Sequence, residues 1–229
     1  MLDEPDHLKD FLKHLEQLKV GVMRQINLLG GNEKAIIPSK TYPLSDVRTL
    51  EIKGNHVIQI AYDGLLPLYI DNTSYKQAIC DYYFDATLCS YDFSGMEDYY
   101  NKPTVIFFHY YDNKIIRDYD NRNYKYILDA IRHTRIMEDD NWQSMSTADF
   151  GFVSDINAVY VYICEEKKLP NVLSDLFENH EQYKEGNMPV ISKEKFIENH
   201  QKKYGKSSDF NEKESKYILD MDDDIWNKI

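Results

Sequence analysis

Residues 117–143 read RDYDNRNYKYILDAIRHTRIMEDDNWQ, and this stretch decides the predicted fold. Just before it, residues 104–111 (TVIFFHYY) form an apolar, β-branched and aromatic run that is typical of a central strand. Residues 121–133 then carry apolar side chains at helical spacing, and a further strand is expected around residues 142–147. The stretch therefore predicts a strand–helix–strand unit at the centre of an α+β domain.

Acidic side chains lie on both sides of the predicted helix. In extended backbone, residues i and i+2 point to the same side, about 6.5–7 Å apart, so Asp118 and Asp120 are expected to face one pocket. After the helix the chain returns with Glu138, Asp139 and Asp140. Carboxylates that meet in this way can hold Mg²⁺. Each group also has a plainer interpretation, because Asp before a helix often caps it and an acidic run is often a solvated loop.

This arrangement resembles the RusA-type Holliday junction resolvases over about 60 residues, roughly 104–164. That family has a DxDN motif, then a helix with a lysine followed by Asp-Ala-Leu, and then a paired aspartate before a strand. The matching residues in this sequence are Asp118, Asp120, Asn121, Lys125, Asp129, Ala130, Ile131, Asp139 and Asp140. The resemblance implies a RusA-like fold, in which a small mixed β-sheet is packed with helices.

The resemblance also implies a magnesium-dependent catalytic site. Asp118, Asp120 and Asp140 are the implied ligands of Mg²⁺ (or Mn²⁺). Asp139 is implied as part of the same metal site, and Lys125 as a catalytic helper near the phosphate. Because the family is homodimeric and nicks four-way DNA junctions, branched DNA and a second copy of the chain are the implied partners.

The charge of the chain restricts how it can meet nucleic acid. Its 229 residues carry a formal net charge of −12, which argues against non-specific coating of DNA or RNA. Basic side chains nevertheless surround the predicted metal ligands: Lys114, Arg117, Arg122, Lys125, Arg132 and Arg135. We therefore expect a local basic surface beside the site of an acidic molecule.

Three features predict a cytoplasmic protein without a membrane segment. No stretch approaches ~18 consecutive apolar residues. The first ten residues, MLDEPDHLKD, are polar and acidic, unlike a secretory signal. The three cysteines are widely spaced and form no zinc-binding pattern, so they are expected to be reduced thiols.

The sequence predicts three parts: an amphipathic N-terminal helix in residues 1–31, a RusA-like α+β domain in residues 32–167 and a helical, acidic C-terminal appendage in residues 168–229. The apolar stripe of the first helix recurs at three- and four-residue steps: Leu8, Phe11, Leu12, Leu15, Leu18, Val22, Met23, Ile26 and Leu29. This spacing is close to that of a coiled coil, so the helix either pairs with a second copy or packs on its own domain.

Three functions follow from these patterns. The leading hypothesis is a magnesium-dependent, structure-specific endonuclease that acts on branched DNA. The first alternative is a non-catalytic RusA-like interaction protein of a mobile element or phage, which binds a protein partner through the N-terminal helix or the C-terminal appendage. The second is an acidic binding module or DNA mimic. Compared with the family spacing, this sequence has one extra residue between Asn121 and Lys125. On a helix, one residue rotates the lysine by about 100° relative to the aspartates, so the two non-catalytic alternatives stay open.

Overall fold

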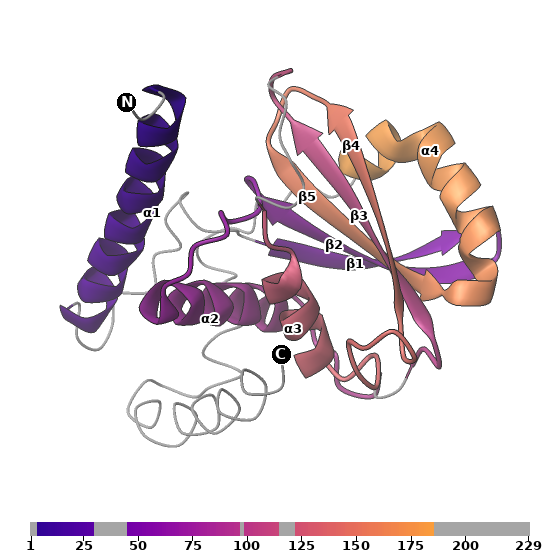
Figure 1. Cartoon of the computed structure of the whole chain (residues 1–229). Helices are drawn as coiled ribbons and strands as arrows, with labels where there is room; N and C mark the ends of the chain where they lie inside the picture. The colour runs from indigo at the N-terminus through magenta and orange to yellow at the C-terminus, as the bar shows by residue number, and fades with distance from the viewer. Residues whose placement is uncertain (1–3, 30–44, 97–98, 115–121, 186–229) are drawn as a thin grey trace.

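The computed structural model describes residues 4–29, 45–96, 99–114 and 122–185. Within these ranges the protein is an α+β structure with a five-stranded mixed sheet and four α-helices (Figure 1). The helices are α1 (Glu4–Leu29), α2 (Thr73–Ser90), α3 (Lys125–His133) and α4 (Leu169–Glu185). The strands are β1 (Ser45–Ile52), β2 (Asn55–Asp63), β3 (Pro103–Tyr111), β4 (Ser146–Val153) and β5 (Ala158–Glu165). The predicted α+β class with a mixed sheet is thus confirmed.

The strands lie in the order β1-β2-β5-β3-β4. β1 and β2 form a hairpin whose turn residues, Lys53 and Gly54, have φ of 50° and 72°, as a two-residue hairpin turn requires. β3 and β4 are parallel, with Thr104 opposite Ser146, whereas all other pairs are antiparallel. α3 makes the crossover between the two parallel strands, so β3, α3 and β4 form a βαβ unit.

Helices cover both faces of the sheet, which explains why β3 and β5 are buried along almost their whole length. Successive side chains of a strand point to opposite faces. On one face, Val105 and Phe107 pack with α2 and α3. On the other face, Phe108 packs with Val172 and Leu176 of α4, and both of these α4 side chains are fully buried. Residues 169–185, assigned above to the C-terminal appendage, therefore pack on the sheet, and residues 186–229 lie outside the described part.

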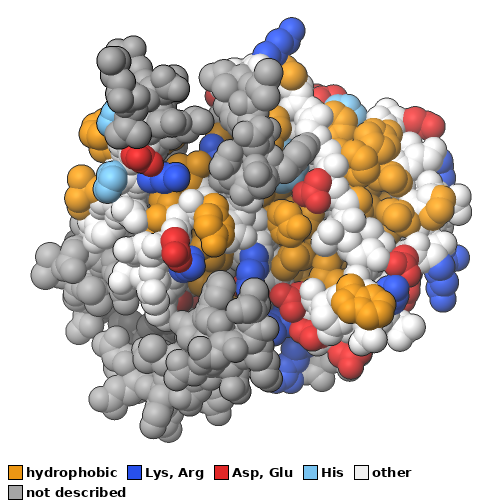
Figure 2. All heavy atoms as spheres, in the orientation of Figure 1, with side chains coloured by type: hydrophobic (Ala, Val, Ile, Leu, Met, Phe, Trp, Pro, Cys, Tyr) orange, Lys and Arg blue, Asp and Glu red, His pale blue; other side chains and the backbone are white. Residues whose placement is uncertain are grey.

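α1 stands apart from the sheet and approaches α2 (Figure 1). Much of its apolar stripe is exposed, and hydrophobic side chains are visible at this side of the molecule in Figure 2. The exposed large side chains of α1 are Leu8, Phe11, Leu12, Leu15, Leu18 and Val22. Within the described ranges, these six side chains are therefore not covered by the rest of the protein.

None of the helices within the described ranges is both long enough and apolar enough to span a membrane.

Candidate functional site at the two ends of α3

The structure describes three of the five predicted site residues. Lys125 is the first residue of α3, and Asp139 and Asp140 lie on the connection from α3 to β4. Since α3 has nine residues, these two groups are separated by a helix about 13 Å long. Asp118 and Asp120 fall in residues 115–121, outside the described part, so their position in the site remains a prediction.

The start of α3 is held by the segment that follows β2. The backbone N–H of Asn123 donates to the carbonyl of Pro67 at 3.1 Å, and an Arg122 guanidinium nitrogen donates to the carbonyl of Leu66 at 2.5 Å. The Asn123 side chain accepts from the backbone N–H of Lys125 at 2.9 Å and so satisfies one free donor of the first helical turn. These contacts fix where the chain enters the helix, directly after the segment that contains the DxDN motif.

Asp139, at the other end of α3, organises a tight turn. Its carboxylate accepts from the Asn141 side chain at 2.7 Å and from the Asp140 backbone N–H at 2.9 Å, and Arg132 lies 3.8 Å away. These hydrogen bonds, the one from Asn141 first, lower the pKa of Asp139 below its usual value, so the group is ionised near neutral pH. An ionised carboxylate is the ligand that Mg²⁺ prefers. Nevertheless, the described residues contain no group of three or more His, Cys, Asp or Glu that could hold a metal ion.

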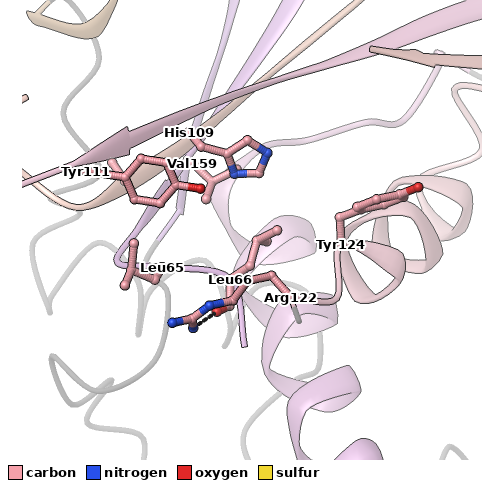
Figure 3. Close-up of a pocket in the computed structure, with 8 residues that line it drawn as sticks. Leu65, Leu66, His109, Tyr111, Arg122, Tyr124 and Val159 are labelled. Carbon is pink, nitrogen blue, oxygen red and sulfur yellow. Dashed lines mark hydrogen bonds between the residues drawn. The ribbon is translucent and has the colours of Figure 1, made fainter. Parts of the chain in front are cut away.

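A small hollow lies at the carboxyl end of β3 (Figure 3). Its volume is about 10 Å³, which is enough for about one water molecule. Figure 3 shows His109 and Tyr111 of β3 on one side and Leu65, Leu66 and Arg122 on the other. The remaining lining residues are Tyr124, Ala158 and Val159. The hollow is too small to enclose a nucleotide, so any larger ligand would bind across its mouth.

A histidine–carboxylate pair lies beside this hollow. His109 is buried, and its Nε2 is 3.3 Å from the Asp149 carboxylate on β4. The imidazole lies between the rings of Phe107 and Tyr111, with ring centroids 6.2 and 6.3 Å away. A carboxylate at one ring nitrogen fixes the orientation of the imidazole. Sequence reasoning missed Asp149, because only the parallel register of β3 and β4 brings it beside His109.

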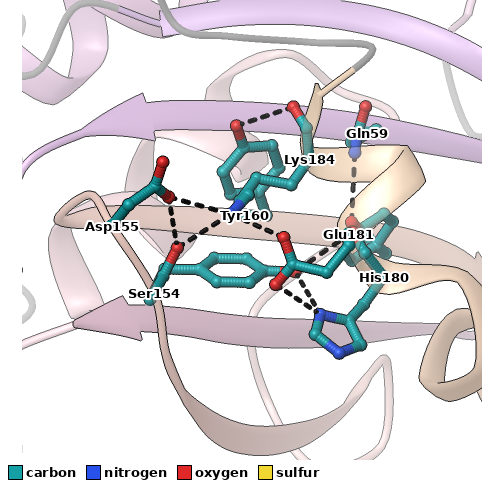
Figure 4. Close-up of polar contacts among 9 residues, drawn as sticks. Gln59, Ser154, Asp155, Tyr160, His180, Glu181 and Lys184 are labelled. Atoms are coloured by element: carbon teal, nitrogen blue, oxygen red, sulfur yellow. Dashed lines mark hydrogen bonds and ion pairs between the residues drawn. The ribbon is translucent and has the colours of Figure 1, made fainter. Parts of the chain in front are cut away.

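A second polar cluster lies where α4 meets the sheet (Figure 4). The buried Lys184 ammonium is 2.6 Å from Glu181, 3.1 Å from Asp155 and 2.8 Å from the Ser154 hydroxyl. Burial alone would lower the pKa of Lys184, but the hydrogen bonds to Glu181 and Asp155 raise it above its ordinary value. The Lys184 ammonium donates to the Ser154 hydroxyl, so in this arrangement it acts as a hydrogen-bond donor to Ser154 and not as a base.

Gln59 connects the sheet to α4 in the same region. Its side-chain oxygen accepts from Arg48 at 2.6 Å, and its amide nitrogen donates to the Tyr162 hydroxyl and to the Tyr183 carbonyl, each at 3.1 Å. Arg48 also donates to the Tyr183 carbonyl at 2.8 Å. Because Gln59 is fully buried, this network stabilises the docking of α4 rather than presenting groups to a ligand.

The fold and the site define an α+β protein whose βαβ unit carries acidic side chains on both connections of its helix. A family model matches residues 16–187, three quarters of the chain, so the protein belongs to DUF6100, a family of unknown function. The match runs from the middle of α1 to the end of α4 and includes the whole βαβ unit. No curated protein matches the chain significantly.

We predict that Gln59→Leu lowers the free energy of unfolding by about 1–3 kcal/mol, because it leaves buried partners of Gln59 without a hydrogen bond. The melting temperature should fall by about 2–10 °C. Thermal unfolding monitored by circular dichroism measures the effect. Gln143→Leu, at an exposed position on the connection from α3 to β4, is the matched control and should change little. A Gln59→Leu variant as stable as the control would contradict the proposed role of the network.

A second prediction concerns Asp139. Because the folded state lowers its pKa, the carboxylate stabilises the fold above the ordinary value of 3.8, and this contribution disappears as pH falls through the lower folded pKa. The wild type should therefore be more stable than Asp139→Asn near neutral pH, and the difference should shrink below about pH 4. Urea unfolding at a series of pH values tests this. Glu51→Gln, an exposed carboxylate on β1, controls for loss of charge. A difference that is independent of pH would exclude the effect.

Proposed function

We propose that this protein is a metal-dependent endonuclease with a RusA-like fold, which cuts branched DNA in the cytoplasm. The observation that supports this proposal is the parallel β3–α3–β4 unit. Its two connections carry the DxDN motif and the aspartate pair in the order that the resolvase resemblance requires. The DxDN motif follows the carboxyl end of β3, where ligands usually bind in sheets with parallel strands, whereas the aspartate pair precedes the amino end of β4. A single site would therefore require the connection before α3 to bring Asp118 and Asp120 back toward Asp140.

The implied metal ligands have suitable chemistry. Asp118, Asp120 and Asp140 would hold Mg²⁺ or Mn²⁺ together with Asp139, because carboxylate oxygens are the ligands that these ions prefer. The pKa of Asp139 is already lowered, so this group needs no deprotonation to bind a cation. A bound metal ion would supply an activated water and stabilise the charge on the leaving oxygen.

The remaining residues of the proposed site would orient the DNA. The Asp139 carboxylate accepts from the backbone N–H of Asp140 at 2.9 Å and so fixes the turn that presents the Asp140 side chain. Lys125, at the first turn of α3, would offset negative charge on the reacting phosphate. Arg132 lies 4.0 Å from Asp129 and 3.8 Å from Asp139, so its own charge is largely balanced within the protein.

The exposed stripe of α1 favours a second function, that of a non-catalytic interaction protein. An apolar surface of several large side chains on one helix face is typical of a protein–protein contact. A RusA-like body without nuclease activity would then serve to present this helix. The two functions differ in one requirement: DNA cleavage would need Asp118, Asp120 and Asp140, whereas binding of a protein partner through α1 would not.

Cleavage of a synthetic four-way junction tests the nuclease. The wild type should cut with Mg²⁺ or Mn²⁺ but not with Ca²⁺, whose larger radius does not support the tight octahedral geometry. Asp118→Asn and Asp120→Asn should each reduce cleavage by at least about 100-fold, as expected for a lost metal ligand, while largely keeping DNA binding. Asp71→Asn, an exposed aspartate paired with Lys76 at 2.8 Å, is the matched control. If the wild type leaves junctions, flaps and single strands intact in millimolar Mn²⁺, the proposal is wrong.

A further inference from the structure

Five side chains of α1 form a regular apolar seam. Leu8, Phe11, Leu15, Leu18 and Val22 follow one another at steps of 3, 4, 3 and 4 residues. Their exposed fractions run from 45% for Leu15 to 68% for Leu8. Steps that alternate between three and four residues are the repeat of a coiled coil, whereas a helix that packs on a globular body usually has a broader stripe. We call these five residues the α1 seam.

We propose that the α1 seam binds the α1 seam of a second copy of this chain and so forms a homodimer. The spacing supports this partner, because each seam supplies the alternating positions that interlock in a two-stranded coiled coil. Among the described residues, none covers the seam, and α2, α3 and α4 pack on the two faces of the sheet instead. Figure 2 shows hydrophobic side chains uncovered on the side of the molecule where α1 lies.

The charge of α1 also favours a second copy. The helix contains four acidic residues, Glu4, Asp6, Asp10 and Glu16, and four basic residues, Lys9, Lys13, Lys19 and Arg24. The net charge of α1 is therefore zero, although the whole chain carries −12. Two copies of this helix can therefore approach each other without the repulsion that the acidic body would cause. A strongly charged partner would gain nothing from a neutral helix.

The size of the seam sets the strength of the contact. From Leu8 to Val22 the helix is about 21 Å long, which corresponds to about two heptads. An interface of this length is smaller than that of most permanent dimers, so the dimer should dissociate on dilution. The seam lies outside residues 104–164, which carry the resolvase resemblance, so this proposal does not depend on nuclease activity.

Sedimentation velocity of the full-length protein, without DNA or metal ions, tests the dimer. Concentrations from about 1 µM to about 1 mM cover the range in which a small interface is half dissociated. The wild type should shift from monomer to dimer across this range. Phe11→Gln with Leu18→Gln removes two seam side chains but keeps good helix formers and the charge, and should weaken association at least about 10-fold. Lys13→Gln, outside the seam, should behave like the wild type.

The outcomes separate the possible occupants of the seam. Because Phe11 and Leu18 are exposed in the monomer, the double variant should keep its circular dichroism spectrum and melting temperature, so a loss of dimer would not reflect unfolding. A wild type that stays monomeric at every concentration overturns the proposal. The seam would then be covered by something other than a second copy, such as residues 186–229 or another protein. A double variant that dimerises as strongly as the wild type also overturns it, because another surface would then form the dimer.

Discussion

Because β3 is buried on both faces, the protein needs a layer of helices on each side of its sheet. This strand lies between β5 and β4, and its side chains from Pro103 to Tyr110 are all buried. Because neighbouring side chains face opposite ways, one helical layer cannot cover them all. The fold therefore needs α2 and α3 on one face and α4 on the other. Burying a polar side chain in this strand is costly unless it is paired, and His109 is paired with Asp149.

The same constraint determines where chemistry can occur. A parallel neighbour for β3 requires a crossover, and α3 with its two connections supplies it. The first connection leaves the carboxyl end of β3, and the second leads to the start of β4. The predicted metal ligands are therefore divided between the two connections of α3: Asp118 and Asp120 precede the helix, and Asp139 and Asp140 follow it. In the proposed nuclease, residues 115–121 would have to bring Asp118 and Asp120 toward Asp140, and this requirement makes the site sensitive to the conformation of that connection.

Much of the fold could be predicted because local signals agreed with the tertiary structure. The apolar run at residues 104–111 is β3, and the helical spacing in residues 121–133 contains α3. Predictions failed where distant contacts decide the boundary. α3 begins at Lys125 rather than near residue 121, because Arg122 and Asn123 bind the segment at Leu66 and Pro67. β4 begins at Ser146 rather than at 142, because Asn141 first forms a turn with the backbone of Ser144.

The candidate site shows the same limit more strongly. Nothing local to Asp149 distinguishes it from other aspartates of this acidic chain, and only the register of β4 places it beside His109. The polar sequence of α4 likewise conceals its role. Val172 and Leu176 are buried against the sheet, Phe177 packs on the ring of Phe108, and Gln59 and Lys184 hold the end of the helix.

The net charge of −12 opposes DNA binding less than the magnitude of that charge suggests. At physiological salt the Debye length is about 8 Å, so a phosphate responds mainly to charges within that distance. Around α3 these charges are mixed: Asp139 lies beside Arg132, and Lys125 begins the helix. Neutralising the aspartates with divalent metal would leave this region basic, whereas the distant acidic surface would be screened. Metal binding and DNA binding would therefore be coupled, since the same ions that complete the proposed site also remove the main repulsion of the phosphate.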